Sequence, residues 1–304
     1  MEEWRPCKTS LTPKCRNNIQ DITGLISFAK ELETLWDAKA LVYRGQGSHC
    51  WGLRTSLERA FERWRVPEEK RVDAERFLLK DFIRRAHHFL KRPPSYKTEV
   101  DILEWLSLLQ HYGAPTRLLD WSYSIYYAVF MAIDSLQFNG GVSEDSAVWI
   151  TDPRWCRDQS NLNLSKCTGK SITGDLLEHR KDAIAESGRQ RIRNFREHFW
   201  EHRVLTAYPA NGFRLNDRVS VQQGVFLCPG NVVVGFEHNF VGLESDSQKQ
   251  RIAVCKLMTS DLSVRENLML DLLRMGISRN QVYPGLEGFA KSLDLRLALW
   301  ERLA

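Results

Sequence analysis

The stretch QHYGAPTRLLDWS, residues 110–122, decides how this chain is interpreted. Apolar, helix-like sequence lies on both sides of it, so part of the stretch is expected inside the fold, where polar groups must find partners. It therefore predicts either a binding site or a structural network in which Arg117 pairs with Asp120. Eight of its thirteen side chains carry hydrogen-bonding groups, namely Gln110, His111, Tyr112, Thr116, Arg117, Asp120, Trp121 and Ser122.

The surrounding sequence predicts regular structure on both sides of this stretch. Residues 101–112 have the pattern of a short helix that Gly113 and Pro115 end. Residues 116–121 predict a short strand, followed by a helix that runs to about residue 138. Further helices are predicted at 22–35, 67–91, 189–203, 262–275 and 286–300, and further strands at 41–43, 147–151, 219–227, 232–236 and 252–257. Residues 154–185 have no clean period, and part of them is predicted to be loop.

This pattern indicates an α+β protein whose first half is rich in helix and whose strands form a central mixed or antiparallel sheet. The chain shows no internal repeat, no low-complexity segment and no linker-like stretch rich in Pro, Gly or Ser. We therefore expect residues 1–304 to form a single domain.

Composition excludes several classes of protein. Ten Trp and fourteen Phe are too many for a disordered chain, and the net charge of +5 is too weak to diagnose a nucleic-acid binder. The seven Cys include no CxxC pair, which argues against a disulfide framework or a zinc ribbon. The N-terminus lacks an apolar signal region, and no apolar stretch is long enough for a membrane span. The expectation is a cytoplasmic protein with reduced thiols, no metal and no membrane partner.

A second constellation is Tyr43-Arg44-Gly45-Gln46, at the end of a short apolar run. An Arg delivered by a buried strand is costly unless it is paired, and its planar fork suits a carboxylate or a phosphate. The alternatives are an internal salt bridge and an anion site.

The third constellation is RVSVQQGVFL, residues 218–227. If this segment is a strand, alternation places Arg218, Ser220 and Gln222 on one side and Gln223 on the other. The neutral amides cannot act as general bases, but they can orient a ribose or an amide. The alternative is a half-exposed strand with ordinary polar residues.

YRGQ at 43–46, Trp51, SLER at 56–59 and QHYGAPTRLLDWS at 110–122 together resemble the FRG domain family, named for its Phe/Tyr-Arg-Gly motif. The resemblance covers about residues 38–140. Two later segments, 218–227 and MGISRNQVYPGLEGFAKSL at 275–293, are similar to longer members of that family.

The resemblance implies a relation to the ADP-ribosyltransferase fold and therefore NAD as a substrate. In that superfamily a first strand carries an Arg or His that meets NAD, which corresponds to Arg44. A second strand and its helix shape the nicotinamide pocket, which corresponds to residues 116–122. A late strand supplies a catalytic Glu, and here Gln222 or Gln223 stands in its place, with Glu201 and Glu237 as flanking substitutes.

The expected function is an NAD-cleaving toxin or effector that modifies nucleic acid or protein, as in bacterial phage defence or a toxin–antitoxin system with a neutralising partner. The catalytic candidates are Arg44, Gln222, Asp120 and His111. The NAD-binding candidates are Tyr43, Gln46, Tyr112, Thr116, Arg117, Trp121, Ser122, Arg218 and Gln223. The alternative is a non-catalytic module that binds a nucleotide or another anion.

Overall fold

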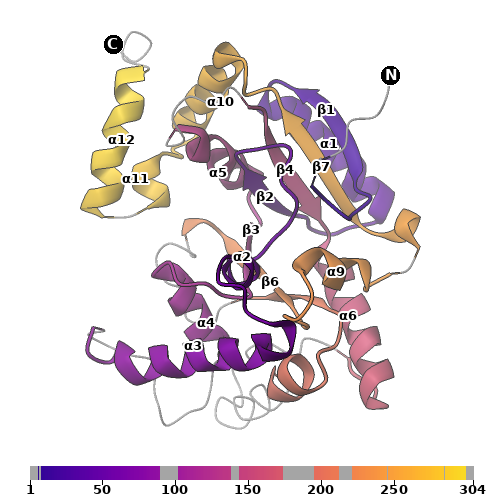
Figure 1. Ribbon diagram of the computed structural model, residues 1–304. Coiled ribbons are helices and arrows are strands. Elements are labelled where there is room, and N and C mark those ends of the chain that lie inside the picture. Colours follow the sequence, from indigo (N-terminus) through magenta and orange to yellow (C-terminus); the bar gives the residue numbers. More distant parts are fainter. Residues whose placement is uncertain are drawn as a thin grey trace, which may run out of the picture.

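The computed structural model describes residues 6, 8–89, 102–137, 144–173, 195–211, 221–244, 246–283 and 285–298. Its centre is a seven-stranded mixed sheet with the order β1-β7-β4-β2-β3-β6-β5 (Figure 1). The strands are β1 (Lys14–Ile19), β2 (Val42–Gln46), β3 (Leu119–Ser122), β4 (Ser146–Thr151), β5 (Ala207–Ala210), β6 (Gly224–Pro229) and β7 (Ile252–Leu257). Only the pair β1–β7 is parallel, so the expected α+β class with a mixed sheet is confirmed.

The helices surround this sheet. They are α1 (Ile22–Trp36), α2 (Ser56–Arg63), α3 (Arg71–Ala86), α4 (Ile102–His111), α5 (Ile125–Gln137), α6 (Pro153–Thr168), α9 (Phe236–Val241), α10 (Leu262–Arg274), α11 (Arg279–Val282) and α12 (Leu286–Ala298). Short 3-10 helices span Glu68–Lys70 and Ser247–Lys249, and a π-helix spans Arg196–Glu201. None of the described helices is long and apolar enough to cross a bilayer.

Alternation along the strands builds separate cores on the two faces of the sheet. In β4, Val148 and Ile150 pack with α1, α5 and α10, whereas Ala147 and Trp149 face a second core that includes Phe236 of α9. A third core joins α3 and α4 to β5 and β6 at the other end of the sheet. Both faces are therefore covered, which explains why β4 is buried along its whole length.

The sheet is weakest in its middle. Strand β2 pairs with β4 over five residues, and β3 pairs with β6 over four. Between β2 and β3 the only register pair is Tyr43 with Ser122. We call this boundary the seam, and it lies between the two motifs that the sequence singled out.

One prediction of local structure is wrong. Residues 232–234 form bends and Phe236–Val241 is helix α9, because Gly235 begins a turn that buries Phe236 and Phe240 on one side. The segment 154–185, part of which was predicted to be loop, begins as helix α6, which Asp152 caps and Pro153 starts, and residues 169–173 have no regular structure. The buried side of α6 includes the polar residues Ser160 and Asn161, so its apolar residues do not recur with a clear helical spacing in the sequence. The remainder of that segment, 174–185, lies outside the described residues.

Other boundaries shift. The predicted helix at 67–91 is a 3-10 turn followed by α3, and the predicted strand at 219–227 begins only at Gly224. The predicted strand at 116–121 is β3, beginning at Leu119. Strands β1 and β5 and helix α2 were not predicted.

Candidate functional site

A pocket of about 390 Å³ opens beside the seam, within the range of small-molecule sites. Strands β2 and β3, helix α5, the turn before β6 and the α11 region all contribute to its wall. The lining residues are Tyr43, Arg44, Gly45, Asp120, Trp121, Ser122, Tyr127, Ala128, Met131, Asp134, Gln222, Arg279 and Tyr283. Six candidates from three separate stretches of the chain therefore meet in one place: Tyr43, Arg44, Asp120, Trp121, Ser122 and Gln222.

Gly45 makes this arrangement possible. A Cβ at this position would lie 1.9 Å from the carbonyl oxygen of Ala128 and 2.6 Å from the amide nitrogen of Ala132. Both atoms belong to the backbone of α5, so they cannot move aside as a flexible side chain would. The glycine of the YRG motif thus lets α5 lie directly on β2, and this contact places Ala128 in the wall next to Arg44.

Arg44 is half-buried and spans the seam. Its Nη1 donates a hydrogen bond of 2.7 Å to the backbone carbonyl of Asp120. Its Nε is buried and, among the described residues, has no hydrogen-bond partner, and no carboxylate there lies within ion-pair distance of its guanidinium. Burial lowers the pKa of Arg44, an effect that Asp120 opposes and Arg59 reinforces. An arginine cannot be deprotonated in a protein, so a cation lies in the wall of the pocket.

Four aromatic residues contribute to the rest of the pocket wall: Tyr43, Trp121, Tyr127 and Tyr283. Trp121 is buried, and its Nε1 has no hydrogen-bond partner among the described residues. Burial, reinforced by the charge of Glu33, raises the pKa of Tyr43, so its hydroxyl remains a protonated donor. The pocket wall therefore combines a cation with aromatic residues, while two donors buried behind it have no acceptor among the described residues.

Asp120 is the exposed acid of the pocket. Gln110 donates a hydrogen bond of 2.6 Å to its Oδ1, and Gln110 in turn accepts one from the hydroxyl of Thr116. This chain orients the carboxylate while one of its oxygens stays available. Three of the eight polar residues in the 110–122 stretch thus act together, although Gln110 was not itself a candidate.

The sequence reasoning missed the far wall of the pocket. Arg279 of α11 forms an ion pair with Asp134 of α5, and both side chains are buried. The guanidinium of Arg279 also lies over the ring of Tyr283, 5.2 Å from its centroid. The resemblance of segment 275–293 to longer FRG proteins was the available signal, but nothing in the pattern singled out these side chains.

Arg117 does not line the pocket. It is completely buried, and its Nε donates to Oε1 of Glu75 at 2.6 Å while its Nη1 donates to the carbonyl of Pro229 at 3.0 Å. Of the two alternatives for this stretch, the pairing of Arg117 with Asp120 is wrong, because α3 supplies Glu75 as the partner. Coulombic attraction to Glu75 raises the pKa of Arg117 although burial, the largest single effect, opposes it. This arginine is part of the core.

Four other candidates lie away from the pocket wall. Gln46 is buried and accepts from Nε1 of Trp149, and Thr116 is buried against Ser56. His111 and Tyr112 lie at the end of α4, where Tyr112 is exposed. Gln46 and Thr116 are thus part of the fold around the site, and none of the four is among the residues that line the pocket.

The 218–227 segment differs from its expected form. Arg218 and Ser220 lie outside the described residues. Gln222 precedes β6, and its amide donates to the carbonyl of Val282 at 3.2 Å. Gln223 follows with φ of 48° and its carbonyl accepts from the amide of Tyr123, so it forms the turn and does not line the pocket.

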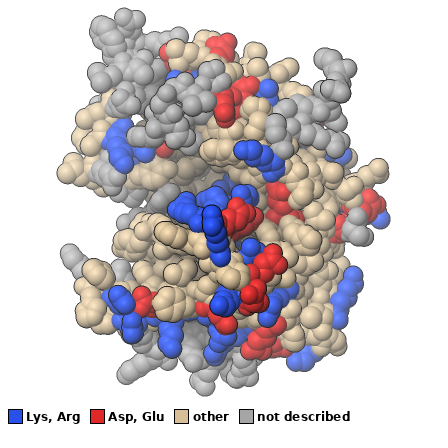
Figure 2. Space-filling view, in the orientation of Figure 1, with Lys and Arg blue, Asp and Glu red and all other residues tan. Residues whose placement is uncertain are grey.

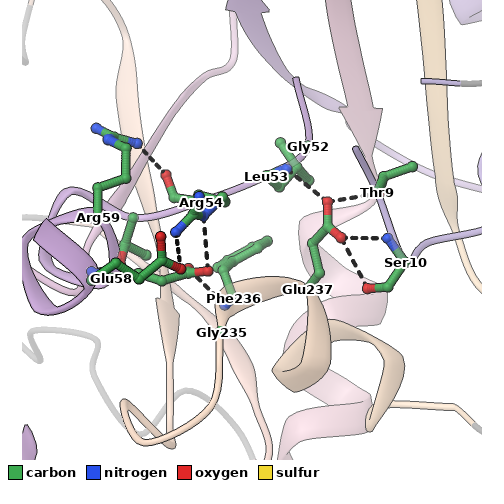
Figure 3. A network of polar contacts seen from close by, with 12 residues as sticks. Thr9, Ser10, Gly52, Leu53, Arg54, Glu58, Arg59, Gly235, Phe236 and Glu237 are labelled. Atoms are coloured by element: carbon green, nitrogen blue, oxygen red, sulfur yellow. Dashed lines mark hydrogen bonds and ion pairs between the residues drawn. The ribbon is translucent and has the colours of Figure 1, made fainter. Parts of the chain in front are cut away.

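Neither flanking glutamate replaces the missing carboxylate. Glu237 accepts four hydrogen bonds, from the hydroxyl of Thr9, the amide and hydroxyl of Ser10, and the amide of Leu53 (Figure 3). Glu201 ends the exposed turn of the π-helix and is not among the residues that line the pocket. Glu237 therefore has a structural role, because it bonds α9 to the N-terminal segment. Among the described residues, no group of three or more His, Cys, Asp or Glu could hold a metal ion.

Comparison with protein families bears on the same part of the chain. Residues 39–139 match the model of the FRG domain, and this range includes β2, α2 and β3 with the residues of the seam. The chain contains an FRG domain. Its YRG motif, residues 43–45, contributes one part of the pocket wall. Three other lining residues, Gln222, Arg279 and Tyr283, lie beyond the FRG match. No curated protein and no solved structure matches the chain.

Proposed function

We propose that the seam pocket binds NAD and that the protein is an ADP-ribosyltransferase-like enzyme. The observation that carries this proposal is the place of Arg44, which forms no ion pair with a described residue, in the wall of a pocket that aromatic residues also line. An anionic ligand with a flat aromatic group satisfies both features, since phosphate oxygens accept from an arginine fork and rings stack.

Each wall of the pocket has a part in this proposal. Arg44 holds a phosphate of NAD, and Tyr43 or Tyr127 packs on the nicotinamide. The bond between nicotinamide and the ribose C1′ breaks, and its electron pair leaves with nicotinamide. An oxygen or nitrogen of the acceptor then bonds to C1′, and its proton passes to the carboxylate of Asp120. Positioning and electrostatics supply the catalysis.

A second function is favoured by the state of Gln222. Its amide already donates to the carbonyl of Val282, and an amide cannot accept a proton. In this alternative the pocket recognises a nucleotide or another anion without cleaving it. The toxin or effector activity, and a partner that neutralises it, belong to the enzymatic proposal alone.

The decisive experiment measures nicotinamide release from NAD by chromatography. We expect Arg44→Ala to abolish release while its urea midpoint stays close to that of the wild type, because only one hydrogen bond, worth about 1 kcal/mol, is lost. The control is Arg274→Ala, an exposed arginine of α10 that pairs with Asp271. Full activity in Arg44→Ala would refute the proposal.

Gln222→Glu separates the two functions. Faster release in this variant supports an enzyme whose missing carboxylate limits its rate. Binding of NAD by the wild type with no release from either protein supports the binding module.

A further inference from the structure

Helix α2 lies at the edge of the candidate site. Its first residues bond to the segment that leads into β3: the amide of Leu57 donates to the carbonyl of Thr116 at 3.0 Å, and the amide of Thr116 donates to the hydroxyl of Ser56. Thr55 caps the helix, while Leu57 and Phe61 are buried. The helix is therefore a rigid support fixed only a few residues from Asp120.

Two arginines on the outside of α2 lack carboxylate partners. Arg59 and Arg63 are one helical turn apart and therefore share a face. Both are exposed, and neither forms an ion pair with a described residue. Nη1 of Arg59 donates instead to the backbone carbonyl of Arg54 (Figure 3).

The acids of α2 do not neutralise this face. Glu58 and Glu62 both pair with Arg54, the first at 3.2 Å, and Glu58 also accepts the amide of Phe236. Burial lowers the pKa of Arg59, and the positive charges of Arg54 and Arg63 add to this effect while the charge of Glu58 opposes it. Figure 2 shows Lys and Arg side chains gathered beside a hollow near the centre of this face of the molecule.

An aromatic residue follows these cations in the sequence. Trp64 comes directly after Arg63, at the end of α2, and is 75% exposed. Its indole is open to solvent, so an unpaired base can stack on it. Cations together with a stacking ring are the features by which proteins hold single-stranded nucleic acid.

We infer that Arg59, Arg63 and Trp64, named here the α2 surface, bind single-stranded nucleic acid and deliver it to the seam pocket as the acceptor. The inference rests on the proposed function, because an acceptor has meaning only if the pocket transfers a group. The arginines hold backbone phosphates, and the indole stacks on one base. Arg44 continues the positive path into the pocket, since its Nη1 bonds to the carbonyl of Asp120, four residues after the Thr116 to which α2 is bonded.

Fluorescence anisotropy with labelled oligonucleotides tests the α2 surface. The probes are a short unstructured RNA, the same sequence as single-stranded DNA, and its duplex, between about 50 and 200 mM KCl. We expect either single strand to bind more tightly than the duplex, and the tighter of the two identifies the acceptor. Arg59→Ala/Arg63→Ala should reduce the salt slope by about 1.4, because each phosphate contact on a single strand contributes about 0.7.

Trp64→Ala should weaken binding about 5- to 150-fold, the range for loss of one stacked base. The matched control is Phe77→Ala, which removes a 67% exposed ring from α3 and should leave the affinity unchanged. Equal binding of duplex and single strands, or an unchanged slope in the double variant, would overturn the inference.

Failure of this inference can be told apart from failure of the proposed function. Nicotinamide release by the wild-type protein tests NAD cleavage without any oligonucleotide. If nicotinamide is released but labelled ADP-ribose appears on protein rather than on nucleic acid, the α2 surface is not an acceptor site and the enzymatic proposal stands. If labelled ADP-ribose appears on the bound single strand, both stand.

Discussion

Two arginines, one from each main motif, have opposite surroundings. Arg117 is surrounded by Glu75, two backbone carbonyls and the rings of Phe195 and Phe199. Arg44 has one carbonyl and an unused Nε. The sequence indicated that both needed partners, but it could not tell which had one, because Glu75 lies 42 residues before Arg117. Only the packing of α3 separates the structural arginine from the one available to a ligand.

Removal of Arg117 tests its structural assignment. Arg117→Ala leaves Glu75 as an uncompensated buried charge, so we expect the free energy of unfolding to fall by about 3–5 kcal/mol. Urea denaturation followed by circular dichroism measures the change. Arg274→Ala, on the exposed side of α10, should change it by less than about 0.5 kcal/mol. A comparable small loss in Arg117→Ala would show that the buried pair contributes little.

At the scale of elements, regular helices were predictable and short strands were not. Helices α1, α5 and α10 were predictable from the spacing of their apolar residues, because each packs one apolar side against a face of the sheet. Strand β1 is largely exposed or half-buried, and β5 is four residues long, so neither shows a clear alternation. Similarly, the pocket could be predicted only in part. The residues that β2 and β3 contribute lie in the two motifs that the sequence singled out, whereas α11 reaches the pocket through packing between segments that are far apart in the sequence.

The contact between β2 and α5 gives a prediction at this scale. Gly45→Ala introduces a methyl group against the α5 backbone, and we expect a loss of about 1–3 kcal/mol in stability together with loss of ligand binding. Thermal unfolding and NAD binding measure the two effects. Gly24→Ala in α1 is the control: its Cβ meets nothing closer than 3.5 Å, so it should be neutral or slightly stabilising. Normal binding by Gly45→Ala would mean that α5 can shift without disturbing the pocket.

Across the whole molecule, each of the three large cores contains buried thiols. Cys255, Cys156 and Cys228 lie in separate cores, and burial raises the pKa of each. For Cys228 the pKa rises from 9.0 to about 12. Because the folded thiol stays neutral where the unfolded thiol ionises, its contribution to stability is complete below pH 9 and is lost as the pH rises toward 12.

Alkaline unfolding therefore reports on the cores. We expect the free energy of unfolding to decrease above pH 9, by up to about 1.4 kcal/mol per pH unit for each buried thiol. Cys228→Ser removes one titrating group with little change in volume, so its dependence on pH should be shallower than that of the wild type. Parallel curves for the two proteins between pH 9 and 10 would contradict this account.

The seam also offers a way to detect binding. Tyr43–Ser122 is the only register pair between β2 and β3, and Arg44 bonds across the same boundary to the carbonyl of Asp120. A ligand in the pocket touches residues of both strands and binds only the folded protein. We therefore expect slower amide exchange in β2 and β3 when the ligand is bound, even in a variant that cannot turn the ligand over.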